Sequence, residues 1–149
     1  MTVCLATTDR EIQEIKDLQK VNLKDNVTAE NRLSDGFLTA EYEFDFLKAM
    51  NDLTPAIIAK QNGRVVGYAL ATDRSLLAQQ PLLKDLGTQI NKIPFGGQFI
   101  GDFDYLVVGQ LCVAKEVRGR GLAKDLYAQF KATYENRYPF AVTDVDRLG

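Results

Sequence analysis

The chain has 149 residues, enough for one domain (residues 1–149) with a single core that requires neither disulfides nor metals to fold. Its 18 basic and 20 acidic residues leave a net charge of -2, so no global field favours nucleic acid or an anionic membrane. The chain has no histidine and only two cysteines, Cys4 and Cys112, which argues against a His or Cys metal site. No segment resembles a targeting peptide or a membrane span, and we therefore expect a soluble, cytoplasmic protein.

Strand-like and helix-like patterns alternate in the first part of the chain. Residues 2–7 alternate like a short strand, and Asp9 is suited to cap a helix that extends to about residue 22. The polar stretch 24–35 is expected to hold a loop or a short helix. A second helix is predicted over about residues 41–52, where Tyr42 and Phe46 recur at helical spacing; such aromatic residues fit either helix packing or an acceptor-binding stripe.

A β-hairpin is predicted in the middle of the chain. Two β-prone runs, residues 56–61 and 64–72, are separated by Asn62-Gly63, a pair in which both residues accept positive φ. Residues 75–97 show an interrupted helical pattern typical of a lid or a loop-helix insertion. Residues 106–114 form the longest apolar run, which predicts a central strand buried on both faces.

The segment after this strand carries the most specific pattern. Gly119 and Gly121 permit a tight turn, Arg118 and Arg120 add charge, and a helix is predicted from Gly121 to about residue 136. The first amides of a helix lack intrahelical partners and lie at the positive end of its dipole. A strand, a glycine turn and a helix N-terminus therefore predict a phosphate-binding cradle, followed by a last strand over residues 140–145.

The run LCVAKEVRGRGLAKDLYAQF resembles the acetyl-coenzyme A binding motif of the GCN5-related N-acetyltransferase family, [R/Q]-x-x-G-x-[G/A] after a central strand. Arg118, Gly121 and Ala123 fill the defined positions, and the hairpin followed by VVGYALA resembles the family's second and third strands. The resemblance covers nearly the whole chain. It implies an α/β (α+β) fold of the acyl-CoA N-acyltransferase type, with a mixed, mostly antiparallel sheet flanked by helices.

The resemblance also implies how acetyl-coenzyme A is held. The pyrophosphate would rest on turn and helix amides, and the pantetheine arm would pair with main-chain groups of the central strand, one of which, at Leu111 or Cys112, would stabilise the oxyanion. The implied cofactor-binding residues are Leu111, Cys112, Val113, Arg118, Gly119, Arg120, Gly121, Leu122, Ala123 and Lys124. The implied activity is direct transfer of acetyl to a primary amine of a small molecule or peptide, without a metal.

Two departures from the family pattern concern catalysis. Many members carry an acidic base on the central strand, where this chain has Gly109 and Gln110, so the catalytic candidates are Asp104, Tyr105 and Gln110. The family also continues beyond the strand at 140–145 with a helix that often supplies the general acid. We therefore expect a shortened form or one completed by a partner, with a homodimer as one option.

The side chain of Cys112 is expected to pack, since no histidine is present to activate it. A non-catalytic acyl-coenzyme A binding or sensing module is the alternative function.

Overall fold

A five-stranded sheet forms the centre of the protein. The computed structural model describes residues 1–25 and 41–143, and its sheet has the strand order β1-β2-β3-β6-β7. The pairs from β1 to β6 are antiparallel and β6 pairs with β7 in parallel, which confirms the mixed, mostly antiparallel sheet. The strands are β1 (Thr2–Leu5), β2 (Ile57–Gln61), β3 (Arg64–Asp73), β6 (Tyr105–Val113) and β7 (Phe140–Val142).

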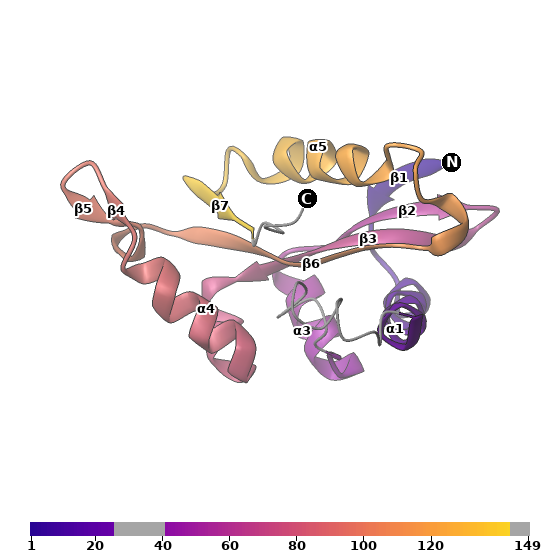
Figure 1. Cartoon of the computed structure of the whole chain (residues 1–149), viewed down its shortest axis with the longest axis horizontal. Coiled ribbons are helices and arrows are strands. Elements are labelled where there is room, and N and C mark those ends of the chain that lie inside the picture. The colour runs from indigo at the N-terminus through magenta and orange to yellow at the C-terminus, as the bar shows by residue number, and fades with distance from the viewer. Residues whose placement is uncertain (26–40, 144–149) are drawn as a thin grey trace.

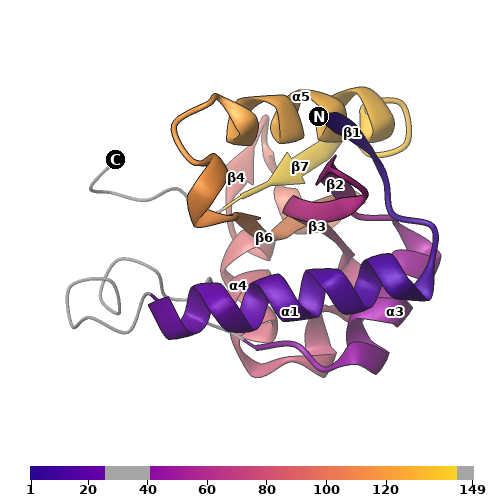
Figure 2. The same cartoon turned by 90° about the vertical axis from the view of Figure 1, so that its right-hand side faces the viewer.

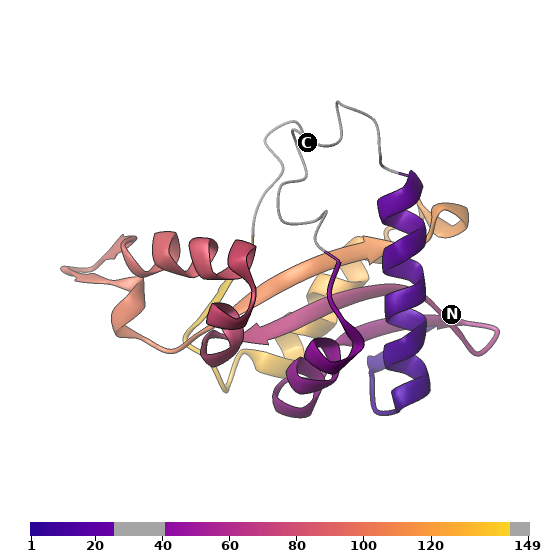
Figure 3. The same ribbon diagram turned by 90° about the horizontal axis from the view of Figure 1, so that it is seen from below.

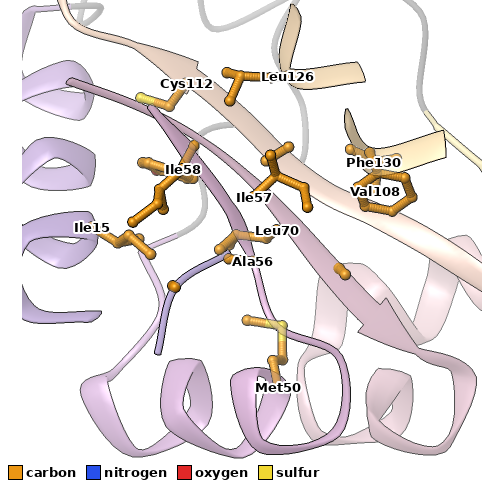
Figure 4. Close-up of a cluster of buried hydrophobic side chains, with 14 of the residues drawn as sticks. Ile15, Met50, Ala56, Ile57, Ile58, Leu70, Val108, Cys112, Leu126 and Phe130 are labelled. Carbon is orange, nitrogen blue, oxygen red and sulfur yellow. The ribbon is translucent and has the colours of Figure 1, made fainter. Parts of the chain in front are cut away.

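Helices cover both faces of this sheet. Helices α1 (Asp9–Asp25) and α3 (Phe44–Leu53) lie on one face, and α5 (Leu122–Tyr134) lies on the other, as Figures 1 and 2 show. Residues such as Ile15, Leu126 and Phe130 point inward from these helices and are buried (Figure 4). The amphipathic spacing in the sequence thus buries one stripe of each helix against the sheet.

The predicted insertion lies at one end of the sheet (Figure 3) and shares the hydrophobic core of the protein. It comprises η2 (Arg74–Gln79), α4 (Pro81–Asn91), the two-stranded hairpin of β4 (Pro94–Phe95) and β5 (Gln98–Phe99), and η3 (Ile100–Asp102). Figure 3 shows the hairpin projecting at the end of the molecule opposite to α1. Its role as a lid stays a prediction.

Local sequence signals predicted several boundaries, but Thr8 rather than Asp9 caps α1, because its hydroxyl oxygen accepts from the N–H of Glu11. Asn62 and Gly63 have φ values of 55° and 76° and close the hairpin of β2 and β3, as predicted. Helix α3 begins three residues later than expected, because the backbone at Glu43 is still extended. Strand β7 is described to Val142. Of the loop or short helix expected over residues 24–35, residues 24 and 25 belong to α1 and the rest lies outside the described residues.

The central strand β6 is buried from Tyr105 to Gln110, in agreement with the prediction of a strand covered on both faces. The described helices include none long and apolar enough to cross a membrane.

Candidate active site

Strand β6 contains a bulge at Gly109. Its neighbours Gln110 and Val108 pair with consecutive residues of β3, Leu70 and Ala71, so one residue of β6 is extra. A Cβ on Gly109 would lie 2.6 Å from the hydroxyl oxygen of Thr72 on β3, so a larger residue here would force the Thr72 side chain to move. Bulges of this kind bend a strand, and this one lies at the middle of β6.

One edge of β6 opens beside this bulge. Strand β7 pairs only with Tyr105, Leu106 and Val107, and no described strand pairs with that edge beyond Val107. At the far end of β6, the N–H of Ala114 donates to the carbonyl of Val66 on β3 over 2.8 Å. Because backbone groups alternate along a strand, the N–H and C=O of Leu111 and Val113 face the open edge, where an extended amide ligand can pair with them.

The turn that follows β6 and η4 (Lys115–Val117) has the geometry of an anion cradle. Gly119 and Gly121 have φ values of 82° and 74°, which residues with a side chain rarely adopt, and Gly121 caps α5. The first backbone bond of α5 runs from the N–H of Asp125 to the carbonyl of Gly121. The amides of Leu122, Ala123 and Lys124 precede this bond and have no intrahelical partner, so they can bind an anion.

The two arginines of the turn differ in their environment. The Nε of Arg118 donates to the carbonyl of Val113 over 3.1 Å, and a terminal nitrogen donates to Oδ1 of Asn22 over 3.1 Å. Arg120 is exposed and makes no hydrogen bond or ion pair within the described chain. The sequence pattern alone did not distinguish the two.

Gln110 belongs to a buried polar cluster beneath β6. It is 2% exposed, and its Oε1 accepts hydrogen bonds from Nε2 of Gln19 at 2.8 Å and from the hydroxyl of Tyr68 at 2.6 Å. Gln19 in turn accepts a bond from the backbone of Tyr42, whose buried hydroxyl has no partner among the described residues. Burial raises the pKa of both tyrosines, so neither phenol is a base at neutral pH.

Cys112 lies next to this cluster. Its sulfur accepts a hydrogen bond from Nδ2 of Asn22, and its side chain is buried (Figure 4). Burial raises the pKa of the Cys112 thiol, which keeps it protonated and poorly nucleophilic. This environment favours the packing role expected for the side chain.

Asp104 and Tyr105 lie at the opposite end of β6, where β7 is still paired. The hydroxyl of Tyr105 donates to Oδ1 of Asn91 over 2.8 Å, and the guanidinium of Arg74 lies 4.7 Å from the centre of its ring. The structure therefore brings Gln110 and the cofactor candidates to the open half of β6 and separates Asp104 and Tyr105 from them.

Sequence reasoning missed Gln19, Asn22 and Tyr68. The signal was present on α1, because Gln19 and Asn22 follow Ile15 at helical spacing on the face that packs against the sheet. Polar residues on a buried helix face require partners, which here are Gln110, Cys112 and Arg118. The described residues contain no group of three or more His, Cys, Asp or Glu side chains that could hold a metal.

The bulged strand, its open edge and the glycine turn at the start of α5 define a fold of the acyl-CoA N-acyltransferase type. The profile of the Acetyltransferase (GNAT) family matches residues 17–147. This chain therefore belongs to the GCN5-related N-acetyltransferase family, and the comparison with curated proteins yields no match.

Solved structures share the fold at low sequence identity. A mutant form of the BH1408 protein from Bacillus halodurans has a TM-score of 0.64 and 14% identity, covering 99% of this chain and 84% of that one. A GNAT family acetyltransferase from Brucella melitensis in complex with acetyl-CoA has a TM-score of 0.59 and 14% identity, covering 97% and 75%. The aminoglycoside N-acetyltransferase AAC(6′)-Iy in complex with CoA has a TM-score of 0.55 and 15% identity, covering 99% and 79%.

Proposed function

We propose that this protein transfers an acetyl group from acetyl-coenzyme A directly to a primary amine in a ternary complex. The proposal depends on the arrangement along β6: the strand contains a bulge, has an open main-chain edge beyond it, and is followed by a glycine turn at a helix N-terminus. Each of these features suits one part of coenzyme A: the thioester end, the pantetheine arm and the pyrophosphate. Family membership supports the same assignment.

The residues present fit this cosubstrate. The amides of Leu122, Ala123 and Lys124 and the exposed Arg120 offer donors and positive charge to a pyrophosphate. The N–H and C=O of Leu111 and the N–H of Val113 offer a strand edge to the two amides of pantetheine, while the carbonyl of Val113 accepts from Arg118. Val113 lies four positions after Gly109, roughly 13 Å along an extended strand, which lets a ligand anchored at the turn extend back to the bulge.

The alternation of backbone groups along β6 supports one donor for the oxyanion. When bound, acetyl-coenzyme A supplies a thioester whose carbonyl carbon bonds to the amine nitrogen. The oxyanion that forms collapses as the bond to sulfur breaks, and coenzyme A leaves as a thiolate that takes a proton from solvent. The N–H of Leu111 faces the open edge, whereas the N–H of Cys112 points toward β3 by the alternation along the strand. We therefore assign the stabilising backbone donor to Leu111 rather than to Cys112.

Deprotonation of the amine is assigned to solvent. Gln110 stands where a carboxylate serves many family members, and its amide cannot accept a proton at neutral pH. The phenol of Tyr68 and the thiol of Cys112 are neutral as well, because burial raises the pKa of each. The acceptor amine must then lose its proton before it reacts.

The buried position of Gln110 also favours the alternative, an acyl-coenzyme A binding module without turnover. Release of free thiol from acetyl-coenzyme A across a panel of primary amines, beside calorimetric binding of coenzyme A, separates the two functions. We expect binding together with amine-dependent thiol release. Binding without release by any amine would favour the module, and absence of binding would exclude both.

A further inference from the structure

The turn that presents the anion-binding amides is conformationally permissive. Gly119 and Gly121 flank Arg120, both have positive φ, and nothing lies within 4 Å of the position of a Cβ at either glycine. A glycine-rich segment loses more backbone freedom on ordering than other sequences do. A turn that is already ordered before the ligand binds does not lose this backbone freedom on binding. Tight binding of an anion therefore requires a contact that holds the turn in place.

Arg118 is placed to supply that contact. It directly precedes Gly119, and its guanidinium donates both to Val113 at the end of β6 and to Asn22 on α1, 96 residues away in sequence. The planar guanidinium fixes two directions at once, which a flexible ammonium does not. The start of the turn is therefore fastened to a strand and a helix.

Asn22 is itself held in one orientation. Its side chain is 7% exposed, its Oδ1 accepts from Arg118, and its Nδ2 donates to the sulfur of Cys112. A flipped amide would turn its N–H donors toward the guanidinium of Arg118 and lose that bond. The acceptor that Arg118 needs is thus aimed at it by the packing of α1 against β6.

We propose that Asn22 is a positioning residue of the cofactor site and acts through Arg118. Asn22 holds the guanidinium of Arg118 against β6, so that the turn keeps its amides and Arg120 directed outward. This inference rests on the proposed function, because it takes the pyrophosphate of coenzyme A as the ligand of the turn. In this arrangement Asn22 does not touch the cofactor, and Arg118 contributes through its contacts with the protein.

A double-mutant cycle tests the link. Calorimetric binding of coenzyme A is measured for the wild type, Asn22→Ala, Arg118→Ala and the double variant. We expect each single variant to bind about tenfold more weakly, as for loss of a hydrogen bond to a charged group, and the double variant to bind no more weakly than Arg118→Ala. Additive losses, or unchanged binding by a folded Asn22→Ala variant, would overturn the proposal.

Three further variants separate positioning from stability. Asn22→Asp keeps an oxygen acceptor for Arg118 and should recover most of the affinity that Asn22→Ala loses. Asn51→Ala is the matched control, because Asn51 also joins a helix to neighbouring backbone through both ends of its amide, but far along the chain from the turn. It should lower the melting temperature and leave coenzyme A binding unchanged. Arg118→Lys keeps the positive charge at this exposed position but lacks the planar guanidinium that donates to both Val113 and Asn22. If this variant bound coenzyme A as tightly as the wild type, the proposal would be contradicted.

Kinetics give an independent readout. A positioning role predicts a higher KM for acetyl-coenzyme A in Asn22→Ala with kcat nearly unchanged, whereas a lower kcat at unchanged KM would contradict it. A wild type that binds no coenzyme A would refute the proposed function itself. A wild type that binds, with Asn22→Ala binding equally well, would refute only the role of Asn22.

Discussion

Tyr138 donates a hydrogen bond of 2.5 Å to the carboxylate of Asp73 and so ties the segment before β7 to the end of β3. Burial and this contact raise the pKa of Tyr138 to about 12. Burial opposes ionisation of Asp73, but the hydrogen bonds from Tyr138 and Ser75 outweigh it and hold the pKa of its carboxyl below the usual value. Each partner therefore favours the protonation state that the other needs.

The pair makes stability depend on pH in two windows. The lowered pKa of Asp73 stabilises the fold above the unfolded value of about 4, and this contribution is lost as pH falls through the folded pKa. The raised pKa of Tyr138 stabilises the fold below about 10, and this contribution is lost as pH rises toward about 12. Tyr138→Phe should cost about 1 kcal/mol at neutral pH, and its melting temperature should converge with that of the wild type at both extremes.

Tyr134→Phe is the matched control for that measurement. Tyr134 donates to the carbonyl of Pro55, which does not titrate, so its contribution should persist at acidic pH. Thermal melts of the three proteins from pH 3 upward distinguish the two hydroxyls. Equal acid sensitivity of both variants would contradict the assignment to Asp73.

Gly109→Ala should destabilise the protein by about 1 to 3 kcal/mol, because the new methyl group would collide with Thr72 at the bulge. Denaturant unfolding measures this loss. Introducing Gly109→Ala into a Thr72→Ala background should recover part of it, since the hydroxyl that causes the collision is gone. A full loss in both backgrounds would mean that backbone conformation, rather than contact with Thr72, requires the glycine.

Gly121→Val should weaken coenzyme A binding by at least about tenfold, or 1.4 kcal/mol. The reason is backbone conformation, because a β-branched residue resists the φ of 74° that caps α5, whereas the surrounding space is open. Gly121→Asn is the control, since asparagine tolerates the left-handed region and should retain most of the affinity. Calorimetry on folded variants decides, and unchanged binding by Gly121→Val would remove the turn from the cofactor site.

Cys112→Ala should keep turnover within a few fold of the wild type. The buried thiol is protonated and has no histidine nearby to activate it, so direct transfer does not require it. Intact-protein mass spectrometry during turnover should find no acetyl group on Cys112. A kinetically competent acetyl-Cys112 would replace direct transfer by a covalent mechanism.

The kcat/KM for the acceptor amine should rise with pH until the amine is neutral, because in the proposed mechanism no protein base removes the proton of the amine. Gln110→Glu should shift this profile toward lower pH. Gln19 and Tyr68 both donate to Oε1 of Gln110, and a carboxylate can accept the same two bonds while adding a base. Profiles of kcat/KM for the two proteins test this, and coincident profiles would show that position 110 does not face the amine.

The sequence predicted the features that depend on local backbone chemistry. The hairpin follows from Asn62-Gly63, and the cap of α5 follows from a glycine in a position that needs positive φ. The contacts of Arg118 with Asn22 and of Gln110 with Gln19 could not be predicted, because they join α1 to residues about 90 or more positions away. Spacing on α1 identifies Gln19 and Asn22 as buried, but only the packing of α1 on the sheet selects their partners.

An aromatic contact joins the β4–β5 hairpin to the start of β7, at the paired end of β6. The ring of Phe95 lies edge-on to that of Phe140 with centres 5.0 Å apart, and Phe103 lies 5.3 Å from the same ring. Phe140 begins β7, a strand with only three paired residues and little stability of its own. The projecting hairpin therefore supports the start of β7, the short strand whose pairing with β6 is described only as far as Val107.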